Sequence, residues 1–547
     1  MAPTNAPWEE LHSDPDDINS KLAVIVRERT GISKVRQFTH LPSIGGARKI
    51  GGANNSITNL TKGVVERIFF VKDSDGQFQL PPQPDPVHFN KQMRRFSEKL
   101  LVGTMSTTPW TRQQFVDSYR GRKWKNYDRA AASLNHTRLV RRDSHVKTFV
   151  KWEKHDLTAK PSFVPRVIQP RSTRYNVEVG RFLSKVEKPM MRAIDGVFGY
   201  PVVMSGYNSA TTGKLFAEAW AGCSDPIGIG LDAKRFDQHV SATALTWEHE
   251  RWLTWFTGED RKRLRRLLRW QLVNTGKGRT RDGTIKYTTD GKRMSGDMNT
   301  SSGNKLIMCA LMHAYLQDRG IKQHRLFNNG DDCMLIIERS YLKAFLHGLE
   351  DWFLSMGFSM QVEPHVNRLE EVEFCQTRPV FDGHAWRMVR NYPLAMDKDA
   401  NCFISCVNGK NVRRWMSGVG KAGLALTGGI PIAQEQYQRY INQSAGYDTI
   451  DIDQDSGFHR MSVGMHEKYR DITPEARASF YAAFGITPDA QIIMENTLAA
   501  WTLHDVPKQR LEKGDMTRGP GWIATLCKCP ELGPNRDSSR VPSLCCA

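Results

Sequence analysis

The chain has 547 residues, of which 39% are hydrophobic, 10% aromatic and 25% charged. This composition is that of a globular protein and excludes a wholly disordered chain, and the length predicts three or four domains at roughly 150 residues each. The formal net charge of +19 favours a polyanionic partner, either a nucleic acid or an anionic membrane.

The start of the chain and its cysteines set the expected compartment. Residues 1–20 contain five acidic residues and no Lys or Arg, which is the wrong pattern for a secretory signal peptide, so we expect reduced thiols in a cytosolic setting. The pairs Cys402/Cys406 and Cys527/Cys529 lack standard zinc spacing and a nearby pair of His, and no structural zinc is expected. No apolar stretch approaches the roughly 18 residues of a spanning helix, which predicts a soluble protein or one that reaches membranes through a partner.

In chain order, residues 1–45 predict a polar extension. Gly63 to Lys72 alternates and contains β-branched residues, which predicts a strand. Residues 90–145 carry helical patterns rich in basic side chains. The apolar run from Pro226 to Leu231 predicts a buried strand that leads into Asp232.

Further along, Arg261 to Trp270 predicts a basic amphipathic helix, which suits a localisation signal or a solvated helix face beside RNA. Thr300 to Leu316 predicts a helix, and Leu342 to Met356 predicts another that Gly357 ends. Residues 400–520 mix helices with glycine-rich loops and carry no motif with a chemical reading.

The strongest charge cluster spans residues 120–174, with fifteen Lys or Arg against four acids, a balance of +11. Such a run is usually a solvated surface, but this one is interleaved with aromatic residues, which favours a nucleic-acid or nucleotide channel. Within it, the segment from Lys147 to Lys154 and the segment from Pro165 to Arg171 place alternating cations on extended backbone. That arrangement suits a triphosphate, and a basic surface strand is the simpler alternative.

Two carboxylates, Asp232 and Asp237, follow the buried strand. A strand that ends at Asp232 places this carboxylate at the edge of a sheet, with Asp237 in the turn that follows. A site that holds two Mg²⁺ for phosphoryl transfer needs carboxylates from at least two backbone elements. Taken alone, Asp232 is more typical of a helix N-cap.

The segment from Ser295 to Asn304 is the second candidate. Its Gly and small hydroxyl residues predict a flexible loop that leads into a helix and lets backbone groups approach a template or nucleotide closely. Thr300 and Asn304 lie one helical turn apart on the same face, and a neutral amide there can bond the ribose 2′-OH that separates RNA from DNA. A linker followed by an N-cap would explain this segment if it stood alone.

Gly330-Asp331-Asp332 is the third candidate, at the predicted tip of a β-hairpin. Asn328-Asn329-Gly330 favours a turn because Asn and Gly tolerate positive φ, and apolar runs lie on both sides. Adjacent carboxylates repel each other, so a fold that concentrates them typically binds a divalent cation. Most Gly-Asp-Asp turns are solvated loop tips, and this one gains weight only from its order after the other motifs.

In the order basic segment, Asp-x4-Asp, Ser-Gly loop and Gly-Asp-Asp hairpin, these motifs resemble the RNA-dependent RNA polymerases of positive-strand RNA viruses. The chain looks most like the plant tombusvirus, umbravirus and luteovirus group of the flavivirus-like branch, over roughly residues 50–400. Glu373 to Gln376 resembles the family's motif E. Many members carry a Lys in motif D to protonate pyrophosphate, but Gly357 to Glu363 contains none, so that role is assigned to no residue.

The resemblance implies an α+β fold shaped as a closed right hand, with fingers, palm and thumb. The palm would be an antiparallel sheet backed by helices, and the fingertips would reach the thumb. The implied regions are a polar N-terminal extension (1–50), fingers and fingertips (51–225, with motif F at 147–171), palm (226–258 and 288–380), a fingers insertion (259–287), thumb (381–520) and a C-terminal tail (521–547).

The resemblance also implies template-directed transfer of NTPs to an RNA 3′-OH. Mg²⁺, with Mn²⁺ as a substitute, would be held by Asp232, Asp331 and Asp332, which would be the catalytic residues. The implied nucleotide-binding residues are Asp237, Ser295, Gly296, Thr300, Asn304, Lys147, Lys151, Arg166 and Arg171.

The expected partners are the RNA template and product, NTPs, and a viral auxiliary protein that supplies membrane targeting. The resemblance therefore implies a location in the host cytoplasm, at membrane-associated replication complexes that the chain reaches through this partner. Two rival functions stay open. A reverse transcriptase shares the metal carboxylates but usually has a bulky side chain at the position of Asp237, and a non-enzymatic RNA-binding or movement-type protein would explain the basic cluster but not the ordered carboxylates.

Overall fold

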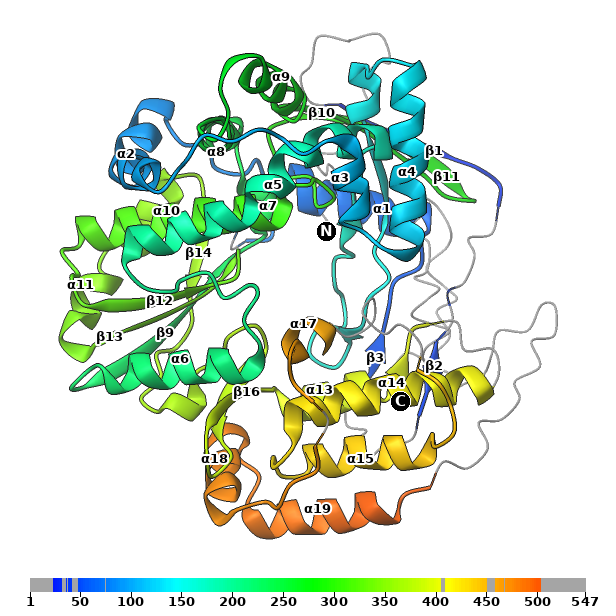
Figure 1. Cartoon of the computed structure of the whole chain (residues 1–547), viewed down its shortest axis with the longest axis vertical. Coiled ribbons are helices and arrows are strands. Elements are labelled where there is room, and N and C mark those ends of the chain that lie inside the picture. The colour runs from blue at the N-terminus through cyan, green and yellow to red at the C-terminus, as the bar shows by residue number, and fades with distance from the viewer. Residues whose placement is uncertain are drawn as a thin grey trace.

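The computed structural model describes residues 23–31, 36, 38–41, 48–73, 75–404, 409–449, 458–466 and 468–502. The expected C-terminal tail, most of the expected N-terminal extension and Cys406 lie outside the described residues. In Figure 1 a four-stranded sheet and its helices occupy the left, a five-stranded sheet the upper right, and a layer of C-terminal helices the bottom.

The four-stranded sheet is antiparallel throughout, in the order β12-β13-β9-β14. Successive side chains of a strand point to opposite faces. Leu335 and Ile337 accordingly belong to one buried cluster, and Met334 and Ile336 to another. Because both faces are covered, the strands are continuous apolar runs, and the predicted strand and hairpin are confirmed. The strands are β9 (Pro226–Ala233), β12 (His324–Asn328), β13 (Asp332–Glu338) and β14 (Met360–Val362).

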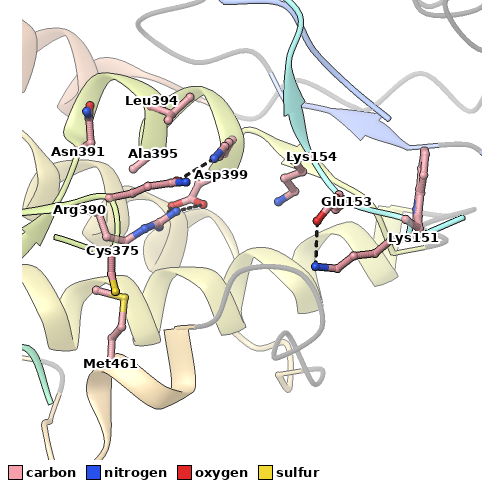
Figure 2. A pocket seen from close by; sticks show the side chains of 13 residues that line it. Lys151, Glu153, Lys154, Cys375, Arg390, Asn391, Leu394, Ala395, Asp399 and Met461 are labelled. Atoms are coloured by element: carbon pink, nitrogen blue, oxygen red, sulfur yellow. Dashed lines mark hydrogen bonds and ion pairs between the residues drawn. The ribbon is translucent and has the colours of Figure 1, made fainter. Parts of the chain in front are cut away.

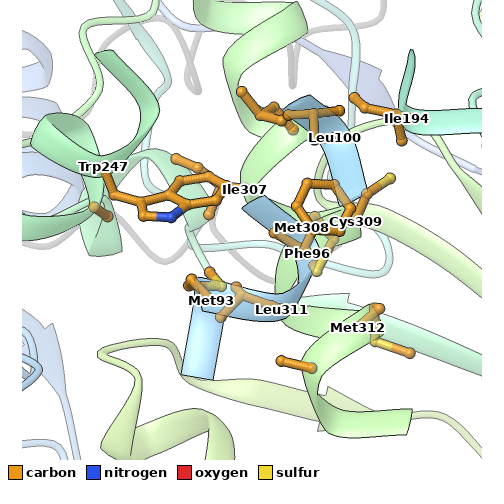
Figure 3. Packing of buried hydrophobic residues seen from close by; sticks show 14 of the residues in the cluster. Met93, Phe96, Leu100, Ile194, Trp247, Ile307, Met308, Cys309, Leu311 and Met312 are labelled. Carbon is orange, nitrogen blue, oxygen red and sulfur yellow. The ribbon is translucent and has the colours of Figure 1, made fainter. Parts of the chain in front are cut away.

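Helices cover both faces of this sheet. Figure 3 shows the larger cluster, in which Phe96 and Trp247 lie near Ile307 and Leu311. On the opposite face, Phe216 stacks on a sheet residue, Phe327, at 3.8 Å between ring centroids. The first face is covered by α2 (Pro86–Val102), α5 (Thr173–Phe198), α8 (Ala242–Leu253), α9 (Gly258–Arg269) and α10 (Thr300–Asp318), and the second by α6 (Ser209–Ala221).

The helices predicted from Arg261 and from Thr300 are both present. α9 buries Leu264, Leu267 and Leu268 and exposes its basic side. α10 is buried continuously from Ser302 to Leu316, which anchors this helix firmly in the core. Across the described residues, no helix combines the length and the apolar character needed to traverse a lipid bilayer.

The five-stranded sheet has the order β1-β11-β10-β6-β8, and β10 and β6 are its parallel pair. The chain after α9 forms the β10–β11 hairpin (residues 273–290) of this sheet. Its strand β10 pairs with β6, and neither strand of the hairpin belongs to the four-stranded sheet. The strands are β1 (Ala23–Glu28), β6 (Val146–Val150), β8 (Val167–Ile168), β10 (Val273–Arg279) and β11 (Gly283–Asp290). α1 (Ile57–Val64) packs on this sheet, and α3 (Arg112–Asp117) and α4 (Gly121–His136) pack on α5.

The C-terminal part is mostly helical and has its own core. Trp415, Met416 and Tyr437 lie in a buried cluster that is separate from the core of the four-stranded sheet. A hairpin of β15 (Thr377–Phe381) and β16 (Trp386–Arg390) leads into it. The helices are α13 (Tyr392–Asp399), α14 (Gly409–Thr427), α15 (Ala433–Gln443), α17 (Phe458–Ser462), α18 (Pro474–Phe484) and α19 (Pro488–Ala500).

Segments from the first 160 residues reach this C-terminal part. β2 (Thr39–His40) pairs with β17 (Asn401–Cys402), and Leu41 is buried in the C-terminal core. Trp152 stacks on Phe403 with 4.3 Å between ring centroids and donates its indole N–H to the Phe403 carbonyl at 2.9 Å. The segment of β2 and Leu41 therefore contacts the C-terminal part through backbone pairing and a buried core residue. The segment that follows β6 contacts it through aromatic stacking.

Two local predictions were wrong. Residues 63–69 are helical, completing α1 and the single π-helical turn η2 (Val65–Phe69), and a strand is formed only by β4 (Val71–Lys72). Leu60, Val64 and Ile68 recur at helical spacing and are buried together, so tertiary packing overrides the β-branched composition. The helix expected from Leu342 is broken into α11 (Leu342–Leu346) and α12 (Leu349–Ser355) at Gly348, where φ is 63°.

Candidate active site

Asp232 and Asp332 are direct partners in the register of β9 and β13. The hairpin that carries the second carboxylate turns at Gly330, whose φ of 100° favours glycine. Asn328 holds this turn by accepting from the Gly330 N–H at 3.1 Å and donating to the Gly330 carbonyl at 2.7 Å. Asp331, between Gly330 and the strand, is exposed, and the pairing of two strands therefore brings the predicted metal carboxylates to one edge of the sheet.

The carboxylates perturb each other. Burial and then the charge of Asp331 raise the pKa of Asp232 above its usual range, while Lys160 and Lys234 act in the opposite direction. Burial raises the pKa of Asp332 to about 6, with smaller contributions from Asp331 and Glu363. Concentrated negative charge of this kind favours a cation or a proton.

Two residues beside Asp332 were not anticipated as part of the site. The Cys375 N–H donates to an Asp332 carboxylate oxygen at 2.9 Å, from a tight turn in which Cys375 and Gln376 both have positive φ, 53° and 59°. Glu363 packs against Gly230, where a side chain would collide with the Glu363 carboxylate. Glycine inside a strand marks such a close approach, so Gly230 was the available sequence signal for Glu363.

The donor set suits Mg²⁺, which prefers carboxylate oxygens and usually keeps several water ligands. The raised pKa values of Asp232 and Asp332 fit a site whose charge is balanced by a cation. In the part of the chain that the structure describes, however, no three His, Cys, Asp or Glu side chains form a preassembled metal cage. The oxygen ligands of Asp232, Asp331 and Asp332 thus suit Mg²⁺, and the pairing of β9 with β13 brings Asp232 and Asp332 together.

The structure brings Asp237 and Asn304 together. Asp237 lies in the short helix α7 (Phe236–His239), just after β9, and Asn304 lies in the first turns of α10. The Asn304 amide donates to an Asp237 carboxylate oxygen at 2.7 Å. Burial raises the pKa of Asp237 to about 6, although the bond from Asn304 lowers it.

The loop before α10 is tied to the basic segment. Ser295 donates to the Val167 carbonyl at 3.0 Å, and Gly296 forms an isolated bridge with Pro170. A Cβ on Gly296 would lie 2.6 Å from backbone atoms of Pro170, so this close approach requires glycine. Thr300 donates to the Met294 carbonyl at 2.8 Å, which closes the loop on itself.

Arg171 was predicted to bind nucleotide phosphates, but its side chain does not face an open site. Its side chain is only 1% exposed and is ion-paired with Asp297. It also donates to the Ser144 carbonyl and to Asn274, each at 2.6 Å. Because its donors are already used inside the protein, Arg171 holds the loop of residues 295–299 against the five-stranded sheet instead of facing a ligand.

The other predicted cations are accessible. Lys147 is exposed on β6. Lys151 and Arg166 share one partner, Glu153, at 2.9 Å and 2.6 Å. Burial opposes ionisation of Glu153, but Arg166 and Lys151 keep its pKa below the usual range. Glu153 therefore arranges two cations side by side and leaves the pair with one net positive charge.

A pocket of about 280 Å³ lies between this basic segment and the C-terminal part. In Figure 2, Lys151, Glu153 and Lys154 form one side, and Arg390 and Asp399 lie opposite. Cys375 also lines the pocket, so it opens beside the residue that contacts Asp332. The pocket thus lies between the basic segment and Cys375, the residue whose N–H bonds Asp332.

Comparison with known proteins gives a consistent match. A sequence model of the family described as viral RNA dependent RNA polymerase matches residues 24–506. The RNA-directed RNA polymerase of Tobacco necrosis virus (strain D) is 39% identical over 505 residues, which cover 91% of this chain and 69% of that protein. For the enzyme of Turnip crinkle virus the identity is 41% over 468 residues, or 84% and 59% of the two chains, and for that of Cucumber necrosis virus it is 43% over 452 residues, or 82% and 54%. The chain thus spans between about half and two thirds of the length of these relatives.

Proposed function

This chain belongs to the family of viral RNA-dependent RNA polymerases, and we propose that it catalyses template-directed RNA synthesis in the replication of a positive-strand RNA genome. In this reaction the 3′-OH of the growing RNA forms a bond to the α-phosphorus of an NTP, and the bond to the β-phosphate oxygen breaks to release pyrophosphate. The observation that carries the proposal is the register of β9 and β13, which sets Asp232 opposite Asp332 and beside Asp331.

The elements fit the parts of a right hand. We assign the four-stranded sheet and its helices to the palm, the five-stranded sheet and the basic segment to the fingers, and the helices after residue 390 to the thumb. The stack of Trp152 on Phe403 supports a closed hand, because it joins the basic segment of the fingers to the C-terminal part. The pairing of β2 with β17 adds a contact between the N-terminal segment and the C-terminal part.

The proposed metal ligands are Asp232, Asp331 and Asp332. Two Mg²⁺ ions, or Mn²⁺ in their place, would supply Lewis-acid chemistry that activates the attacking hydroxyl and stabilises the leaving pyrophosphate. The Cys375 N–H holds one oxygen of Asp332, which limits the orientations that this carboxylate can adopt. Glu363 adds negative charge near the same ligands.

The proposed nucleotide contacts follow from what each side chain can still bind. Asp237 and Asn304 form a polar pair suited to a ribose 2′-OH, which both donates and accepts hydrogen bonds. Lys147, Lys151 and Arg166 would neutralise phosphates. Ser295, Gly296 and Thr300 would shape the backbone that faces the template and nucleotide, and Arg171 would support that loop from behind.

The proposed partners are an RNA template and product, NTPs and a viral auxiliary protein that directs the polymerase to membranes. The net charge of +19 supports the RNA partners. We place the protein at membrane-associated replication complexes in the host cytoplasm.

The test is synthesis on a short RNA template with Mg²⁺ and labelled rNTPs. We expect template-length product from the wild type and none from Asp331→Ala/Asp332→Ala, while both proteins bind RNA with similar salt-sensitive affinity, since binding depends on dispersed Lys and Arg. Product from the double variant would refute the metal assignment. Tight RNA binding without product from either protein would favour a non-enzymatic RNA-binding role.

A further inference from the structure

The ribose-reading pair rests on a buried ion pair behind it. Arg293 and Glu248 have side chains that are 0% exposed, and the guanidinium of Arg293 binds the carboxylate of Glu248. The same guanidinium donates through Nε to Oδ1 of Asn304 at 3.0 Å. Asn304 then donates through Nδ2 to Asp237 at 2.7 Å, so a continuous chain of contacts runs from Glu248 to Asp237.

This chain has only one chemically consistent direction. An Arg side chain can only donate hydrogen bonds, and an ionised carboxylate can only accept them. The oxygen of the Asn304 amide must therefore face Arg293, and its NH₂ group must face Asp237. A rotated amide would set NH₂ against the guanidinium and oxygen against the carboxylate, which loses both bonds.

Glu248 itself is held from several sides. Its Oε1 accepts from Asn299 at 2.7 Å and from the indole of Trp252 at 2.8 Å. Gly303 leaves room for the pair, because a Cβ there would collide with Glu248 and lie 2.6 Å from Arg293. These contacts hold the guanidinium of Arg293 in a buried position from which its Nε reaches Asn304.

We propose that Arg293 and Glu248 are positioning residues that set the discrimination between ribose and deoxyribose by fixing the orientation of the Asn304 amide. Neither side chain touches the nucleotide. The inference rests on the proposed function, since it concerns how that site selects rNTPs over 2′-dNTPs.

Arg293→Lys is the informative change. A Lys keeps the charge beside Glu248 but lacks the planar fork that binds Glu248 and Asn304 together. The ratio of kcat/KM for ATP to that for 2′-dATP should fall about tenfold, the effect of one hydrogen bond worth ~1.4 kcal/mol. The fall should come mainly from poorer use of ATP, because only ATP carries the 2′-OH that the oriented amide binds. Should Arg293→Lys not fold, Glu248→Gln, which turns one acceptor oxygen into a donor, is expected to lower the same ratio.

The matched control is Arg387→Lys. Arg387 is a buried Arg paired with a buried carboxylate, Asp382, in another part of the protein. The Arg387→Lys variant should lower the melting temperature as much as Arg293→Lys does but leave the ratio of kcat/KM for ATP to that for 2′-dATP unchanged. A purely structural ion pair at Arg293 would give this control's result, and that outcome would overturn the inference.

A double variant tests whether Arg293 acts through Asn304. If it does, Arg293→Lys/Asn304→Ala should have the same ratio as Asn304→Ala alone, because no amide is left to orient. A further fall in the double variant would overturn the inference. Equilibrium binding of ATP and 2′-dATP gives an independent readout. If the wild-type protein makes no product, the proposed function is refuted. If the wild-type protein also binds ATP and 2′-dATP with equal affinity, the inference about Arg293 and Glu248 is refuted as well.

Discussion

Asn304 donates a hydrogen bond of 2.7 Å to Asp237, a residue 67 positions earlier in the chain. Asp237 follows the central strand β9, and Asn304 belongs to a helix that is buried along most of its length. The bond therefore joins two rigid elements and depends on the packing of α10 against the sheet. The consequences of this geometry can be measured.

Asn304→Ala should relax sugar selection. Removing the amide leaves Asp237 without its neutral partner, and the ratio of kcat/KM for an rNTP to that for its 2′-dNTP should fall by roughly ten- to a hundredfold, as expected for one hydrogen bond to a charged group. Single-nucleotide incorporation measures the ratio. Asn401→Ala is the control, because this buried Asn donates to the Asp397 carbonyl at 2.7 Å and lies 3.2 Å from a ring nitrogen of His40, in the C-terminal part and not at the carboxylates of the four-stranded sheet. An equal loss in that variant would contradict the assignment.

Asp332→Asn should stabilise the metal-free protein at pH 7.5. The pKa of Asp332 is raised to about 6 in the fold, so the stability it contributes at low pH is lost as the pH rises through about 6. A neutral Asn avoids that loss, and we expect a gain of about 1 kcal/mol. Urea unfolding in EDTA measures the gain, which should disappear below pH 4. Mg²⁺ should stabilise the wild type more than the variant.

Asp382→Asn gives the opposite sign and so controls for the charge change. Burial opposes ionisation of Asp382, but bonds from the Ala385 N–H and from Arg387 keep its pKa below the usual range. Its stability contribution is therefore present above the unfolded pKa and is lost as the pH falls. This variant should be less stable than the wild type at pH 7.5, and a gain in both variants would show that the sign argument is wrong.

Gly296→Ala should disturb the loop before α10. The new methyl group would lie 2.6 Å from the Pro170 backbone, so the loop or the basic segment must move, at a cost of about 1–3 kcal/mol. We expect lower stability and a larger loss in kcat than in RNA affinity. Gly196→Ala in α5 has no neighbour within 4 Å and should instead stabilise the protein by about 0.5–1 kcal/mol through helix propensity.

Trp152→Ala should loosen the connection between the fingers and the thumb. The variant loses the stack on Phe403 and the indole bond to its carbonyl, and we expect a loss of about 2–4 kcal/mol in unfolding free energy. If the closed hand encloses RNA, dissociation from a preformed polymerase–RNA complex should become faster. Trp124→Ala, at a side chain on the exterior of α4, should change neither quantity, and unchanged RNA dissociation in both would contradict the closed-hand proposal.

The sequence was sufficient for elements whose own residues set their structure. The apolar run of β9, the Asn-Gly turn before Asp331 and the helix from Thr300 are all present, because periodicity and turn chemistry act over a few neighbouring residues. The strand prediction for Gly63 to Lys72 was wrong because it, too, considered only neighbouring residues. The β-branched residues favour a strand locally, and only packing against the five-stranded sheet made the segment helical.

Motif order likewise identified the family and named Asp232, Asp331 and Asp332 as partners, since they are local features of the chain. Which atoms meet was decided by the tertiary structure. Arg171 belongs to the basic segment by sequence, but in the fold it forms an ion pair with the buried carboxylate of Asp297, 126 positions away. Glu363, Cys375 and the Arg293–Glu248 pair acquire their places only when distant strands and helices pack, because hydrogen bonds and burial depend on distances in space that residue order does not encode.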